Sequence, residues 1–129
     1  MAELDLPGPR LPEWPPHFPV GCPGDDTEPV SGDVYRLVRN ERDWQSWKER
    51  GLRDGNDCVL SSLSCRRTLK DAQDFRRSMV RYRNASIVHG VLTPEHGRIK
   101  QTGDPPHFSL WLRMVHLLAH ATLFSTVPE

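Results

Sequence analysis

Prolines crowd the beginning of this chain. Eight of its twelve prolines lie within the first 29 of 129 residues. Because proline fixes φ, donates no backbone hydrogen bond and restricts the preceding residue, regular helices and strands are not expected there. The same stretch holds large apolar residues that a fully solvated segment does not need, including Trp14 and Phe18. We therefore expect an acidic, irregular arm over residues 1–31, docked on the domain or on a partner, and a single domain over residues 32–129.

The domain alternates between extended and helical patterns. Residues rich in β-branched and aromatic side chains predict strands over 33–38, 58–65, 86–92, 97–102 and 107–112. Helices are predicted over 40–51, 68–83 and 113–124, the first two beginning at the capping residues Asn40 and Thr68. This order predicts an α+β fold, in which two to three helices pack on one face of a mainly antiparallel sheet of about five strands.

Several short segments carry a resemblance to known proteins. They are "VYRLV", "LSSLS", "VHGVL", "GRIKQTGDPPHFSLW" and a terminal helix rich in alanine and leucine. In this order they resemble a family of small, largely uncharacterised bacterial proteins, over residues 33–124. The resemblance implies an α+β fold and a cytoplasmic location, and it implies no activity.

Composition bounds the compartment and the partners. The formal net charge is zero, so no overall field attracts nucleic acid or a membrane surface. The first residues lack the basic and apolar regions of a secretory signal, and no apolar run is long enough to span a membrane. The cysteines Cys22, Cys58 and Cys65 are sparse and odd in number, which suits a reducing compartment better than a disulfide scaffold. We expect a soluble cytoplasmic protein with no membrane partner.

Charge is unevenly distributed along the chain. Residues 1–33 carry seven acidic residues and one basic residue, whereas residues 66–83 carry seven basic and two acidic ones. The basic residues of the predicted helix 68–83 include Arg76, Arg77 and Arg81. Such a face can contact an acidic protein surface, including the arm itself. Nucleic acid fits less well, because the net charge is zero and Tyr82 is the only aromatic residue expected on the exposed side of this helix.

Three histidines near the C-terminus raise the alternative of a metal site. His116 and His120 are four residues apart, so a helix would place both on one face, and His107 could add a third zinc ligand. His89 is a possible fourth group. However, Leu117 stands where a zinc peptidase helix has its glutamate, and Arg113 would repel a cation.

A further alternative is the consumption of NAD. Arg36 on the first predicted strand, followed by the serine-rich segment that contains Ser61, Ser62 and Ser64, resembles the opening elements of ADP-ribosyltransferases. That chemistry needs a later glutamate, and the only acids after Glu95 are Asp104 and Glu129. Neither is well placed.

The sequence as a whole favours a non-catalytic protein-interaction or accessory module without a cofactor. It would bind another protein through Arg76, Arg77 and Arg81 of the basic helix and through Trp14 and Phe18 of the arm. The leading alternative is a small zinc-dependent hydrolase built on His107, His116 and His120, and a nucleic-acid-binding module is a further one. The partner's identity and the oligomeric state are not determined by these patterns.

Overall fold

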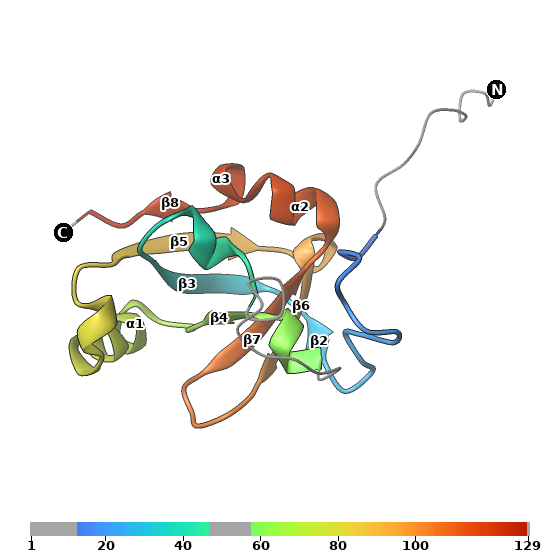
Figure 1. The fold of residues 1–129 in the computed structure, drawn as a ribbon, viewed down its shortest axis with the longest axis horizontal. Coiled ribbons are helices and arrows are strands. Elements are labelled where there is room, and N and C mark those ends of the chain that lie inside the picture. The colour runs from blue at the N-terminus through green and yellow to red at the C-terminus, as the bar shows by residue number, and fades with distance from the viewer. Residues whose placement is uncertain (1–12, 47–57, 129) are drawn as a thin grey trace.

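The strands of the protein form two antiparallel sheets, as a computed structural model that describes residues 13–46 and 58–128 shows (Figure 1). The first sheet has the strand order β2 (Glu28–Pro29), β6 (Gly97–Gln101), β7 (Phe108–Leu112) and β4 (Leu63–Cys65). The second has the order β3 (Gly32–Val38), β5 (Ser86–Leu92) and β8 (Ser125–Thr126). A bridge between Tyr35 and Arg66, with N–O distances of 2.8 and 2.9 Å, joins the two sheets where β3 meets β4.

Short helices connect and flank the sheets. The described α-helices are α1 (Leu69–Ser78), α2 (Met114–Leu118) and α3 (His120–Leu123). The 3₁₀ turns are Glu41–Trp44, Cys58–Ser61, Val80–Tyr82 and Pro94–His96. Helix α1 packs beside β3, and α3 lies against β5 (Figure 1).

The α+β class and the antiparallel pairing expected from the sequence are confirmed. The strands divide into two sheets, however, rather than forming one sheet. The predicted strand 86–92 coincides with β5, and Thr68 caps α1 as expected, its hydroxyl accepting the Asp71 N–H at 3.1 Å. The first half of the predicted strand 58–65 is instead a 3₁₀ turn. The helix expected at 40–51 begins as a 3₁₀ turn, and its second half lies outside the described residues.

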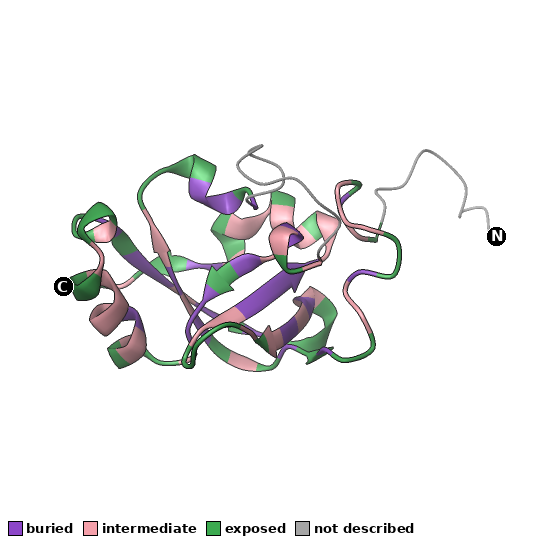
Figure 2. Ribbon diagram, turned by 60° about the horizontal axis from the view of Figure 1, so that its bottom comes forward, coloured by how far each residue is buried: buried purple, intermediate pink, exposed green. Residues whose placement is uncertain are grey.

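The core combines side chains from both sheets with Val30, Trp44 and Phe124, which lie outside the strands. Buried residues follow the strands (Figure 2), and the main cluster consists of Val30, Val34, Trp44, Leu63, Cys65, Val88, Leu92, Ile99, Leu110, Leu112 and Phe124. Burying one such large apolar side chain stabilises the fold by roughly 1.5–3 kcal/mol. Because side chains alternate along a strand, Val34 and Arg36 of β3 share the buried side, and an arginine enters the core (0% and 6% exposed).

The described part of the proline-rich arm is attached to the domain. The side chain of Trp14 lies 4.6 Å below the guanidinium of Arg113 and stacks on Phe18. The Met114 N–H donates to the Glu13 carbonyl at 2.9 Å. Docking of Trp14 on the domain is therefore confirmed. The end of the arm forms β2 and supplies Val30, which is fully buried, to the core.

A disulfide joins Cys22 of the arm to Cys58, with a Cα–Cα distance of 5.6 Å. The expectation that the cysteines do not form a disulfide framework is therefore wrong for this pair. Thirty-six positions separate the two residues, so their approach depends on how the arm folds back, which no local pattern reveals. Cys65 is free and buried. Among the described residues no helix is long and apolar enough to cross a membrane.

Candidate anion-binding site

A cavity of about 70 Å³ lies where the two sheets meet. It is lined by residues of β3 and β4, by the turn that follows β3, and by α1 with the 3₁₀ turn after it. Its volume exceeds the roughly 10–15 Å³ that one water molecule needs. The cavity therefore has room for several waters or for one small oxyanion.

The guanidinium of Arg36 is the main charged group of this cavity. Its Nε donates to the Ser64 carbonyl at 2.8 Å, and the group lies 4.6 Å from the ring of Trp44. Its Nη1 is shielded from solvent and has no hydrogen-bond partner among the described residues. Burial lowers the pKa of Arg36 to about 10, so the side chain still carries its charge at neutral pH. A buried cation with an unused donor is costly unless something pairs with it.

Arg66 supplies a second positive charge to the same cavity. It is 8% exposed, and its guanidinium lies 4.0 Å from the ring of Phe75 on α1. Its Nη1 reaches the Cys65 carbonyl at 3.5 Å, whereas its Nε has no described hydrogen-bond partner. Burial lowers the pKa of Arg66 as well. The bridge to Tyr35 fixes the main chain at this position, which holds the two arginines on adjacent strands.

The negative charge in the cavity belongs to Asp43, which is already hydrogen-bonded to Arg39. Asp43 is the carboxylate among the described lining residues, and both of its oxygens accept hydrogen bonds from Arg39, at 2.7–3.0 Å. The hydrogen bonds from Arg39 hold the pKa of Asp43 below its usual value although burial opposes them. Burial raises the pKa of the Cys65 thiol to about 12, so the thiol stays neutral. The cavity therefore has a net positive charge, which favours anions.

The serine-rich segment lies beside these arginines. Ser62 and Ser64 line the cavity, and Ser61 is buried with a hydroxyl that has no hydrogen-bond partner within the described chain. Arg36 and this segment, which the sequence places one after the other, therefore lie side by side in the fold. Arg66 and Asp43 were not predicted as site residues. The sequence signal for Arg66 was its place in the basic stretch 66–83, directly after a short strand.

The three histidines of the alternative metal site do not lie together. His107 contacts Ser64, with 2.9 Å between Nε2 and Oγ. His120 stacks on Trp44 at a centroid distance of 4.2 Å, and His116 contacts His96. The possible fourth histidine, His89, stacks on Tyr35 and bonds to Asp33. Helical spacing predicted one shared face for His116 and His120, but the helix breaks between them at Ala119.

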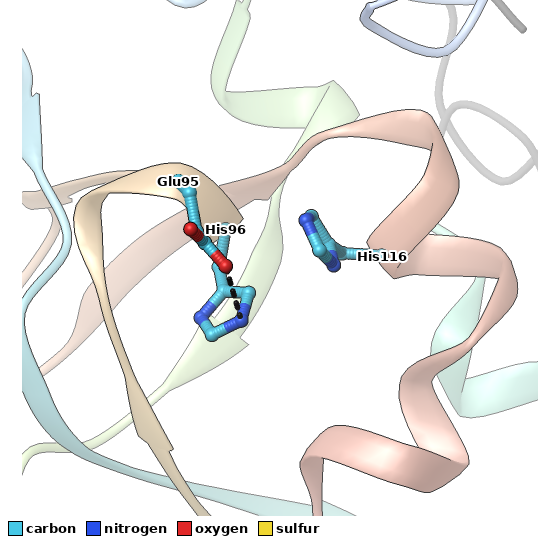
Figure 3. Close-up of side chains that lie close together, drawn as sticks. All are labelled: Glu95, His96 and His116. Atoms are coloured by element: carbon cyan, nitrogen blue, oxygen red, sulfur yellow. Dashed lines mark ion pairs between the residues drawn. The ribbon is translucent and has the colours of Figure 1, made fainter.

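A different cluster brings together Glu95, His96 and His116, whose ligand atoms lie within 4.8 Å of one another (Figure 3). His96 Nδ1 accepts the Thr93 N–H at 2.9 Å. Neutral His96 therefore carries its proton on Nε2, the atom that faces Glu95. A metal-bound histidine normally has the opposite arrangement, with one bare nitrogen on the metal and the other donating. The cluster as built is a histidine pair beside a carboxylate and does not fit a metal.

The predicted partner-binding residues form contacts within the chain. Arg76 donates to the Ala85 carbonyl at 3.1 Å. Arg77 pairs with Asp74, and the guanidinium of Arg81 lies 5.4 Å from the ring of Tyr82. The arm's aromatic residues dock near Arg113 rather than on α1. Partner binding by these residues stays a prediction.

Comparison with known proteins returned no relative. No protein-family model, curated protein or solved structure matches the chain. The resemblance to small bacterial proteins stays a prediction.

Proposed function

We propose that this protein binds the phosphate group of a small ligand in the cavity between β3 and β4. The observation that carries the proposal is Arg36, a core guanidinium with an unused N–H at a cavity that already contains a second buried arginine. Arginine favours phosphate because its planar fork of donors matches two phosphate oxygens. An anion there would supply the hydrogen bonds that Arg36 and Arg66 lack.

The proposal accounts for the charges that surround the cavity. Arg39 occupies both oxygens of Asp43, so this carboxylate does not neutralise Arg36 fully. The neutral thiol of Cys65 adds no charge. Two guanidinium groups in a site screened from water attract a phosphate more strongly than exposed groups do.

Titration calorimetry of the full chain with inorganic phosphate tests this function. We expect saturable binding at one site, competition by sulfate, and loss of binding in Arg36→Met. Arg77→Gln is the matched control, because it also removes one positive charge, but from a side chain that is 72% exposed on α1. Equal phosphate binding by Arg36→Met and the parent protein would contradict the proposal, as would no binding by the parent.

The same protein can be tested for the consumption of NAD. An ADP-ribosyltransferase would release nicotinamide from NAD. We expect no turnover, because Asp43 is the described carboxylate of the cavity and its oxygens are engaged by Arg39. Nicotinamide release that disappears in Arg36→Met would favour the transferase alternative.

We also propose that an acidic protein surface binds at the basic end of α1. The observation that favours this second function is Val80, a 77% exposed apolar side chain that stands between Arg77 and Arg81 in the sequence. An exposed apolar group among positive charges suits an interface better than solvent. Affinity for such a partner should decrease modestly with salt. Binding to RNA or DNA with a steep salt dependence would contradict it.

The cysteines bear on the compartment of the protein. Disulfides persist in oxidising environments, so the pairing of Cys22 with Cys58 argues against the cytoplasmic location expected from the sequence. We propose an oxidising compartment. Alkylation of the native protein without reductant should modify neither of the two cysteines, and ready modification of both would restore the cytoplasmic assignment.

A further inference from the structure

Ser64 and His107 form a hydrogen-bonded pair at the edge of the candidate anion site. Ser64 is the central residue of β4, and His107 precedes β7, the strand that pairs with β4. The distance between Ser64 Oγ and His107 Nε2 is 2.9 Å. Ser64 is exposed, so reagents from solvent can reach it. This distance is within the range at which a histidine can activate a hydroxyl nucleophile.

The hydrogen bonds of the imidazole determine the direction of the Ser64 contact. His107 Nδ1 lies 3.0 Å from the carbonyl oxygen of Thr102 and 3.2 Å from its hydroxyl. A carbonyl only accepts, so Nδ1 carries the proton and donates to it. The neutral ring then has a lone pair on Nε2, and the Ser64 hydroxyl donates to it. Ser109 holds the Thr102 hydroxyl from the other side at 2.7 Å, which completes a network that orients the ring.

The protonation state of His107 suits the role of a base. Burial lowers the pKa of His107, and the positive charge of Arg66 lowers it further, against the bond to Thr102 that raises it. The ring is therefore neutral at neutral pH. Other serines differ in this respect. The hydroxyls of Ser62 and Ser78 donate to the main-chain carbonyls of Val59 and Phe75, which cannot remove a proton.

We propose that Ser64 is a nucleophile that accepts an acyl group, with His107 as its general base. Ser64 Oγ attacks the carbonyl carbon of the acyl donor, and its proton moves to His107 Nε2. The bond between the carbonyl carbon and the leaving oxygen then breaks. That oxygen takes the proton from His107, which leaves Ser64 as an ester.

The charge of the cavity selects the class of donor. Ser64 lines the cavity of Arg36 and Arg66, and its carbonyl accepts the Arg36 Nε–H. An acyl phosphate combines a reactive carbonyl with a dianionic leaving group that these arginines can hold. This choice of donor rests on the proposed function, whereas the nucleophile rests on the pair of Ser64 and His107 alone.

Acylation can be measured by mass spectrometry of the full chain. The protein is incubated with acetyl phosphate or with the neutral ester p-nitrophenyl acetate, its cysteines are blocked, and it is digested with trypsin. The peptide between Arg53 and Arg66 contains no lysine, so an acetyl group on it lies on a hydroxyl or on a cysteine thiol, and fragmentation shows which residue carries it. We expect both reagents to acetylate Ser64. Once each rate is corrected for the intrinsic reactivity of the reagent, acetylation by acetyl phosphate should be the faster.

Variants separate the nucleophile from a merely accessible serine. His107→Gln should lower the rate at Ser64 by a factor of about 10²–10⁴, the usual contribution of a general base. Ser64→Ala should abolish the adduct, and Ser78→Ala, the control on α1, should leave the rate unchanged. In the parent protein the rate should decrease as pH falls and His107 becomes protonated, and this profile should vanish in His107→Gln.

The outcomes distinguish the two proposals. No adduct at Ser64, or an adduct that forms equally fast in His107→Gln, would overturn the nucleophile even if inorganic phosphate binds. Acetylation of Ser64 by the neutral ester, in a protein that does not bind phosphate, would support the nucleophile and contradict the phosphate site.

Discussion

Replacing Arg36 with methionine should remove ligand binding while leaving stability nearly unchanged. Arg36 is 6% exposed, and its side chain faces the core beside Val34. Methionine has a similar length, has no charge and adapts to irregular spaces. A residue retained for binding rather than for stability should show this combination, since functional groups in a core are often maintained at the expense of stability.

The expected change in stability is the difference between the cost of burying the Arg36 charge and the contacts that the side chain makes. Burial lowers the pKa of Arg36 to about 10, which corresponds to a cost of about 3 kcal/mol for the charged form, at about 1.4 kcal/mol per pKa unit. Removing the charge recovers that cost. The substitution loses the charged hydrogen bond to Ser64, worth about 1.5–3 kcal/mol, and a contact with Trp44 worth about 1–2 kcal/mol. The sum predicts a change in unfolding free energy within about 1–2 kcal/mol of zero.

Urea unfolding of the parent and of Arg36→Met measures this difference, provided that the unfolding free energy of both proteins depends on urea concentration with the same slope. The same titrations in the presence of inorganic phosphate should stabilise the parent and leave the variant unaffected. Arg77→Gln should respond to phosphate as the parent does. A loss of more than about 3 kcal/mol in Arg36→Met without phosphate would refute the reasoning, because it would make Arg36 a structural residue whose contacts outweigh the cost of burying its charge.

The structure supports three further predictions. Cys22→Ser opens a disulfide that spans 36 positions and should lower the unfolding free energy by roughly 3–4 kcal/mol, measured by urea unfolding without reductant; a change below about 1 kcal/mol would contradict it. Gly97→Ala would place a methyl group 2.0 Å from the Trp111 carbonyl oxygen and should lower the melting temperature strongly, whereas an unchanged value would show that β6 and β7 can separate. Burial lowers the pKa of His96 and of His107, so their unfolded forms bind protons more readily. The contribution of these two histidines to the unfolding free energy should therefore be fully present above their unfolded pKa of about 6.5 and should decrease as pH falls below it. An unfolding free energy that increases as pH falls below about 6.5 would contradict the lowered pKa values.

Local patterns determined those parts of the fold in which neighbouring residues decide the conformation. The extended segment 86–92, rich in β-branched residues, predicted β5 at its observed bounds. Thr68 marked the start of α1. Its hydroxyl accepts a hydrogen bond from the Asp71 N–H, which has no acceptor within the first turn of the helix. The antiparallel α+β class followed from the order of such segments.

Tertiary structure decided which distant segments meet. The strand period predicts that Arg36 and Val34 share a side, but burial of that side follows only when β3 lies next to β4 through the bridge between Tyr35 and Arg66. The spacing of His116 and His120 predicted a shared face, yet α2 ends before His120 and His116 meets His96 instead.

The candidate site depends on these long-range contacts most of all. His107 reaches Ser64 across 43 positions, and Cys22 reaches Cys58 across 36. Periodicity and capping report on a few consecutive residues, because they arise from the geometry of one turn or one pleat. The pairing of β4 with β7 is selected instead by the packing of the whole core. The sequence alone therefore predicted elements such as β5 and the start of α1, and only the tertiary structure brought the two arginines, Ser64 and His107 into one place.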